Sequence, residues 1–266
     1  MSDENNERRN LSAYPVWDRT TRWFHWLNAF CVLTLAVLGL AILNGESFGV
    51  SADGKVLLKT LHSYVGYVFV VNLFWRFAWG FFGGHYSRWQ SVLPVGRGFA
   101  TAFRAYVRGF FAGDPPAYLG HNPPGRVMIT LLLLLLLVQG VTGLVLAGTD
   151  LYQPPFGSAI AEWVTGGDAD KLARLEPGSR DFVDPEAYDE MRAFRSPIVT
   201  THEYVFYLLI ALAALHIIGV IVTETRERNG TISAMFTGEK VLANRPVDPS
   251  PALSARCRLP GDEDDT

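Results

Sequence analysis

Histidine is the residue type in this 266-residue chain whose spacing best suits chemistry. Two of the six histidines, His202 and His216, lie in one apolar stretch, residues 199–223. Their separation of fourteen residues places them roughly 40° apart around a helix that turns about 100° per residue. At about 1.5 Å per residue they are roughly 21 Å apart along its axis. Because neutral imidazole commonly ligates transition metals, this helix offers two candidate ligands at two depths.

Four apolar blocks could position such ligands, and each has about the 20 residues that a spanning helix needs. The blocks are residues 23–43, 61–82, 127–147 and 199–223. A soluble core is the weaker reading, because the polar interruptions fall between the blocks and not at helical spacing within them. The polar start, MSDENNERRN, and the length of the first block exclude a signal peptide, so we expect this block to remain as the first span. The sequence therefore predicts an all-α membrane protein with a four-helix bundle.

Lysine and arginine are shared unevenly between the two sides of the predicted membrane domain, residues 1–238. With the residues after 238 included, the side that would hold both termini carries 15 of them and the other side seven. The positive-inside rule then places both termini in the cytoplasm and the long connection 148–198 outside. The remaining residues, 239–266, contain several prolines and arginines and end in GDEDDT, so we expect a disordered cytoplasmic tail.

This topology sorts four histidines into two levels. Span one runs outward, so His25 lies near the cytoplasmic side. Spans two and four run inward, which puts His62 and His202 near the outer side and His216 deeper. Each level therefore holds two imidazoles from different helices, His62 with His202 and His25 with His216.

Paired imidazoles on facing helices suit a six-coordinate haem that is held without a covalent bond. Cys31 and Cys257 belong to no C-x-x-C-H motif, which excludes c-type attachment. With both axial positions filled, a haem iron passes single electrons and does not easily bind oxygen. Two such haems, one in each leaflet, would form an electron path across the membrane.

Two further residues of span two could belong to these sites. Gly66, one turn after His62, would leave room for a flat ligand against the backbone, and helix packing explains it equally well. Arg76, fourteen residues after His62, is a candidate partner of a haem propionate, with snorkelling to the membrane surface as the alternative.

The ordered set of motifs resembles the bacterial cytochrome b-561 family, which includes the b-type subunit of nickel–iron hydrogenases. The motifs are Arg22-x-x-His25-Trp26, His62-x-x-x-Gly66, Arg76-x-x-Trp79-Gly80, Gly120-His121-Asn122-Pro123-x-Gly125, Thr142-Gly143 and the His202/His216 pair. The resemblance covers about residues 14–238 and implies a four-helix protein of the bacterial inner membrane with two b-type haems. The family's axial ligands correspond to His25, His62, His202 and His216.

The resemblance also implies a function, namely electron exchange between the quinone pool and a periplasmic redox partner. That partner would be a hydrogenase-like subunit or a c-type cytochrome. Arg22 and His121 would line a quinone site near the inner haem, and His121 is also a candidate propionate contact. Membrane lipid is the other expected neighbour, and no nucleic-acid partner is expected. The chain would be an electron-transfer subunit, a candidate for the quinone-reactive part of an oxidoreductase complex.

Three alternative functions remain open for the same chain. A haem-free metal transporter would more naturally add Asp, Cys or Met ligands. A proton relay would need a titratable bridge across the roughly 21 Å between the two levels. A purely structural membrane anchor would tolerate loss of all four imidazoles.

Overall fold

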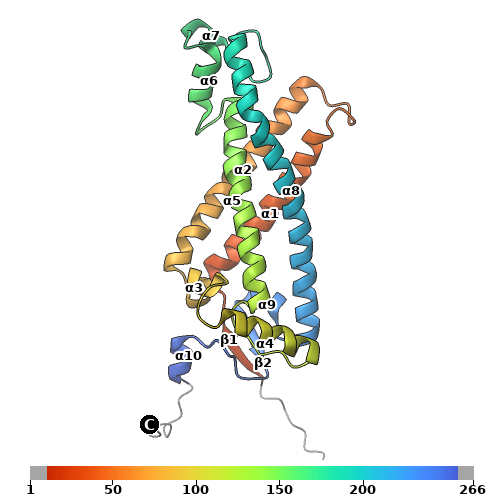
Figure 1. The fold of residues 1–266 in the computed structure, drawn as a ribbon, viewed down its shortest axis with the longest axis vertical. Coiled ribbons are helices and arrows are strands. Elements are labelled where there is room, and N and C mark those ends of the chain that lie inside the picture. The colour runs from red at the N-terminus through yellow and green to blue at the C-terminus, as the bar shows by residue number, and fades with distance from the viewer. Residues whose placement is uncertain (1–10, 257–266) are drawn as a thin grey trace, which may run out of the picture. The chain divides into compact units, whose positions relative to one another are not determined.

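Four long helices dominate the computed structural model, which describes residues 11–256. They are α1 (Arg19–Leu43), α2 (Ala52–Phe82), α5 (Pro123–Leu151) and α8 (Pro185–Glu227). All four are long and apolar enough to cross a membrane. Each predicted block lies inside one of these helices (Figure 1), so the prediction of four spanning helices is confirmed.

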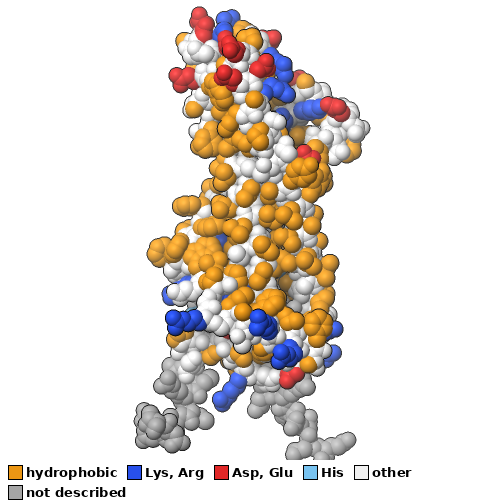
Figure 2. Space-filling model, in the orientation of Figure 1, with side chains coloured by type: hydrophobic (Ala, Val, Ile, Leu, Met, Phe, Trp, Pro, Cys, Tyr) orange, Lys and Arg blue, Asp and Glu red, His pale blue; other side chains and the backbone are white. Residues whose placement is uncertain are grey.

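The spanning helices expose apolar side chains on their outer surfaces. Only 6% of the most apolar part of α1 and of α8 is buried, and the corresponding values for α2 and α5 are 28% and 17%. Figure 2 shows hydrophobic side chains spread over these helices on the face in view. Water would disfavour so large an apolar surface, whereas the lipid interior of a bilayer solvates it.

The chain divides into two compact units, each built from separate segments. Unit 1 takes the described parts of residues 1–23, 77–131 and 214–266, and unit 2 takes 24–76 and 132–213. Each of the four long helices contributes one end to each unit.

Unit 1 contains a two-stranded antiparallel sheet and five short helices. Strand β1 (Ser12–Pro15) pairs with β2 (Glu239–Leu242), with Ser12 opposite Leu242. Its buried core is formed by Val16, Trp17, Tyr86, Leu119, Ala234 and Leu242. The short helices are η1 (His85–Ser87), α3 (Trp89–Val92), α4 (Phe99–Ala112), α9 (Thr231–Thr237) and α10 (Pro251–Arg256).

The tail after α9 differs from the sequence-based expectation of disorder. Residues of β2 are ordered by their pairing with β1. Farther along, Asp248 accepts hydrogen bonds from the backbone N–H groups of Leu119 and Gly120, at 2.7 and 2.9 Å. These contacts join positions more than 120 residues apart, so local composition did not reveal them. The last part of the predicted tail, residues 257–266, lies outside the described residues.

The connection before α8 belongs to unit 2 and is folded. It contains α6 (Gly157–Thr165) and α7 (Ala169–Arg174), and a small core of Ile160, Val164 and Met191 joins α6 to the start of α8. Asp168 caps α7 by accepting from the N–H groups of Asp170 and Lys171. Helix α8 begins at Pro185, whereas the predicted span begins at residue 199. The helical residues before 199 form a charged segment, which a search for apolar residues does not include.

Candidate functional site

Unit 2 brings two of the predicted ligands together. The imidazole centroids of His62 on α2 and His202 on α8 are 6.3 Å apart, and their planes differ by 68°. Two imidazoles that bind one metal from opposite sides have centroids about 6 Å apart, since each metal–nitrogen bond is about 2 Å and each ring centre lies roughly 1 Å beyond its nitrogen. The spacing of this pair therefore fits one shared metal ion.

A cavity of about 240 Å³ adjoins both rings, and residues of all four long helices line it. Three glycines shape it. A Cβ at Gly39 would lie 3.5 Å from Cε1 of His62, and a Cβ at Gly143 would lie 3.4 Å from Cε1 of His202. A Cβ at Gly66 would meet nothing within 4 Å. Each imidazole thus lies against a glycine of another helix, and Gly66 borders open space, which favours the ligand reading over close helix packing.

Thr142 on α5 sets the protonation of His202. Its hydroxyl oxygen lies 2.8 Å from Nδ1 of His202 and 2.7 Å from the carbonyl oxygen of Val138. The one hydroxyl proton is donated to the carbonyl, so the hydroxyl oxygen accepts from Nδ1–H. The remaining nitrogen, Nε2, then carries the lone pair that a metal needs.

Gln139 lies at that second nitrogen. Its amide nitrogen is 2.9 Å from Nε2 of His202, and its buried carbonyl oxygen has no hydrogen-bond partner. Nδ1 of His62 is also buried without a partner. Unsatisfied polar atoms of this kind are unusual in a finished core and are expected where a ligand completes a site. Gln139 would have to turn aside for a metal to reach Nε2.

The donor set limits which metal group fits. Among residues 11–256, no group of three or more His, Cys, Asp or Glu side chains could hold a metal ion. Two imidazoles alone leave most coordination positions of a transition metal unfilled. A porphyrin supplies four equatorial nitrogens and needs only two axial ligands, so the histidine pair and its glycine-lined cavity fit a haem.

The second predicted pair lies in different units. His25 belongs to the part of α1 in unit 2, and His216 belongs to the part of α8 in unit 1. The ring of His25 packs edge-on against Trp26, with centroids 5.1 Å apart. The joint binding of a haem by His25 and His216 stays a prediction.

Arg76 lies inside unit 2 and not at the lipid surface. It is 5% exposed, and its guanidinium carbon is 5.9 Å from the ring centroid of Phe24 on α1. One turn earlier, the amide of Asn72 donates to the carbonyl oxygen of Phe24 at 3.2 Å. A snorkelling side chain would extend to the membrane surface, so the burial of Arg76 favours a role within the protein.

The two candidate quinone residues have separate neighbours in unit 1. The His121 ring lies 4.7 Å from the ring of Trp17, centroid to centroid. The Arg22 guanidinium donates to the carbonyl oxygen of Phe236, near the end of α9. Their place near a quinone stays a prediction.

Sequence reasoning missed a polar centre at Asp18. Its carboxylate accepts from the N–H of Thr21 at 2.7 Å, the hydroxyl of Ser87 at 2.8 Å and the indole of Trp79 at 3.2 Å. Burial alone would raise the pKa of Asp18, but these hydrogen bonds outweigh burial and lower the pKa below its ordinary value of 3.8. The Trp79-Gly80 motif therefore serves the packing of unit 1, since a Cβ at Gly80 would overlap the indole of Trp89.

Comparison with known proteins agrees with the resemblance in the motifs. The family profile described as prokaryotic cytochrome b561 matches residues 16–238. Similar proteins include subunits named "Probable Ni/Fe-hydrogenase B-type cytochrome subunit" from Rhizobium leguminosarum bv. viciae and Bradyrhizobium diazoefficiens. The first is 26% identical over 240 residues, covering 86% of this chain and 90% of the relative. The second is 28% identical over 240 residues, covering 85% of each.

A third relative, from Escherichia coli strain K12, is named "Probable Ni/Fe-hydrogenase 1 B-type cytochrome subunit" and is 31% identical over 148 residues. The match covers 52% of this chain and 61% of that relative. No solved structure matches the chain significantly. Because the family profile covers most of its length and all four apolar helices, the chain belongs to the prokaryotic cytochrome b561 family, as a haem-binding membrane protein of electron transport.

Proposed function

We propose that this b-type cytochrome carries electrons across the bacterial cytoplasmic membrane through two haems, between the quinone pool and a periplasmic redox partner. The observation that carries the proposal is the pair His62 and His202, 6.3 Å apart beside a glycine-lined cavity. The two residues would be the axial ligands of the outer haem. When bound, the haem supplies an iron that accepts and releases one electron.

The surrounding residues would prepare the histidines for this task. Thr142 holds Nδ1–H of His202, which fixes the ring and leaves Nε2 unprotonated. Gly39 and Gly143 allow both rings to lie close to neighbouring helices. The mainly apolar walls of the cavity would exclude water, and burial of a haem is one of the factors that set its reduction potential.

The second haem would be held by His25 and His216, which the sequence topology assigns to one level. Arg76 and Arg22 would belong to the haem environment, and the burial of Arg76 supports its part. Arg22 and His121 would line a quinone site on the cytoplasmic side. A path through two haems needs both levels, because about 21 Å separates them along α8.

The orientation of the chain in the membrane and the names of its relatives support the proposed periplasmic partner. The uneven distribution of Lys and Arg favours cytoplasmic termini, and the folded connection with α6 and α7 would then lie in the periplasm. Relatives named as hydrogenase cytochrome subunits support a hydrogenase-like partner. A long, folded connection between spans offers such a partner a surface to bind.

Haem content measured on purified variants tests the proposal. Wild-type protein should show a b-type spectrum in reduced-minus-oxidised difference and bind two haems per chain. H202A should lose one haem, and H85A, which changes an exposed histidine of η1, should keep both. A colourless wild-type protein that moves metal ions in vesicles would instead favour the haem-free transporter.

A further inference from the structure

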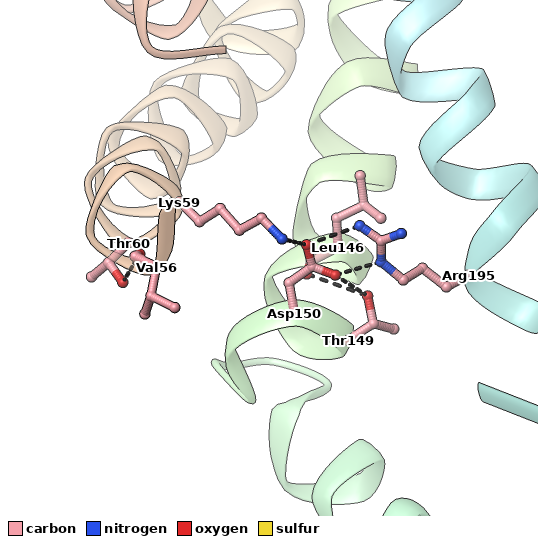
Figure 3. Close-up of polar contacts among 7 residues, drawn as sticks. All are labelled: Val56, Lys59, Thr60, Leu146, Thr149, Asp150 and Arg195. Atoms are coloured by element: carbon pink, nitrogen blue, oxygen red, sulfur yellow. Dashed lines mark hydrogen bonds and ion pairs between the residues drawn. The ribbon is translucent and has the colours of Figure 1, made fainter. Parts of the chain in front are cut away.

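Three charged residues meet at one side of the cavity and are called the Asp150 triad here: Lys59, Asp150 and Arg195. Figure 3 shows Lys59 of α2 and Arg195 of α8 reaching the carboxylate of Asp150 on α5 from opposite sides. Nζ of Lys59 lies 2.6 Å from Oδ2, and Nη2 of Arg195 lies 2.9 Å from the same oxygen. Nε of Arg195 also donates to Oδ1. One carboxylate therefore holds two cations.

The triad lies on the same helix faces as the histidine site. Lys59 is three residues before His62, and Arg195 is seven residues before His202. Both separations return to nearly the same side of a helix, since 3.6 residues make one turn. The three triad residues and the two histidines, five side chains in all, line the same cavity.

The charges of the triad do not cancel. Two cations and one anion leave one positive charge on the triad. The other charged residue of the mainly apolar lining is Glu203, which is exposed and forms no ion pair with Lys59 or Arg195 among the described residues. The side chain of Asp150 is 12% exposed, that of Arg195 26% and that of Lys59 35%. The single carboxylate links the three helices, and it leaves N–H donors on both cations free to bind a further anion. Lysine carries three N–H donors and arginine five, of which Asp150 uses one and two respectively.

The haem assigned to this cavity would supply that anion. A b-type haem carries two propionate carboxylates on one edge of its ring, and arginine and lysine are the side chains that bind carboxylates. We propose that Lys59 and Arg195 bind the propionates of the outer haem, and that Asp150 positions these two cations before the haem enters. This inference rests on the proposed function, because it requires a haem at His62 and His202.

Redox titration of the purified, haem-loaded protein tests the proposal, because the reduction potential responds to the sign of each nearby charge. K59Q and R195Q remove a cation and should lower the midpoint potential of the outer haem. D150N removes the anion and should raise it. K59R keeps the charge and should leave the potential near the wild-type value. The outer haem is identified as the component that H202A lacks.

Lys55 provides the matched control. It lies one turn before Lys59 on α2, forms a 3.1 Å ion pair with the exposed Glu46 and does not line the cavity. K55Q should leave the potential unchanged. Haem added back to stripped protein should bind about tenfold more weakly to R195Q than to K55Q, as expected for the loss of a charged hydrogen bond.

Two outcomes would overturn the assignment. The first is an unchanged potential in both K59Q and R195Q, which would make the triad only a link between three helices. The second is a shift of the same sign in D150N and K59Q. If D150N does not fold, the contrast between K59Q and K59R decides. A protein in which H202A retains every haem would instead refute the proposed function itself, so the two failures are distinguishable.

Discussion

Two groups of glycines in this cytochrome, one in each unit, differ in the space around them. In unit 1, a Cβ at Gly80 would overlap the indole of Trp89, and one at Gly120 would lie 2.9 Å from the Tyr86 ring. In unit 2, a Cβ at Gly66 would meet nothing within 4 Å, and those at Gly39 and Gly143 would only touch histidine rings. Aromatic side chains fill the space beside Gly80 and Gly120 in unit 1, whereas unit 2 leaves space beside the two imidazoles. Open space at this point indicates a site for a ligand, because protein interiors are otherwise close-packed.

The largest expected effect comes from filling the space beside Gly66 in unit 2. In G66L the leucine side chain should occupy the cavity, and the outer haem should be absent from the purified protein while the fold is retained. The matched control is A211L, on an exposed position of α8 that lies nine residues from His202, on the opposite helix face. Haem per chain and thermal unfolding in detergent are measured. Full haem content in G66L would show that the cavity is not the binding site.

The next largest effect is expected from adding a side chain at Gly80, where the Trp89 ring leaves no room for it. G80A should destabilise the protein by about 1–3 kcal/mol, since the added methyl group must displace the Trp89 ring. G219A is the control, because a Cβ at exposed Gly219 meets nothing within 4 Å. Thermal unfolding of the two variants is compared. Equal stability would mean that the packing at Trp89 is loose, and the contrast between the units would weaken.

A smaller, pH-dependent effect is expected at Asp18. D18N should lower the free energy of unfolding by about 2 kcal/mol at neutral pH, because charge-assisted hydrogen bonds are lost. The folded-state pKa of Asp18 is below 3.8, so its stabilisation is present above that value and is lost as the pH falls through the folded pKa. Unfolding of wild type and D18N between pH 7 and pH 3 tests this. A stability difference that does not shrink in acid would contradict it, and D189N, at an exposed carboxylate, should match wild type throughout.

The smallest effect in this series concerns Thr142. T142V removes the acceptor of Nδ1–H on His202 and should weaken binding of the outer haem by about tenfold. This value is at the lower end of the range of affinity losses seen when the hydrogen-bond partner of a metal ligand is removed. T142S retains the hydroxyl and should restore the affinity. Titration of haem into stripped protein measures this. A wild-type affinity in T142V would show that the histidine is oriented by other contacts.

The four spanning helices and the common face of His202 and His216 could be predicted from the sequence for a physical reason. A bilayer imposes about 20 apolar residues on each spanning helix, and helical geometry fixes the faces of His202 and His216. The structure brings the ring centroids of His62 and His202 within 6.3 Å of each other, with their planes 68° apart, and their role as haem ligands stays a prediction.

Other parts of the site depend on tertiary structure. The ion pairs of the Asp150 triad join three segments that are distant in the sequence, and no local sequence pattern predicts these contacts. Thr142 belongs to one of the sequence motifs, but His202, the common partner of Thr142 and Gln139, is 60 or more residues away. The order of the tail likewise depends on contacts with β1 and with residues 119 and 120.

The pairing of β1 with β2 also has a consequence for how the protein is made. Ser12 emerges from the ribosome long before its partner Leu242, and all four spanning helices are synthesised between the two strands. The N-terminal strand must therefore wait until the last helix has been delivered to the membrane. A chain cut short before residue 239 would leave this strand without β2, so completion of the sheet marks a chain whose helices have all been made.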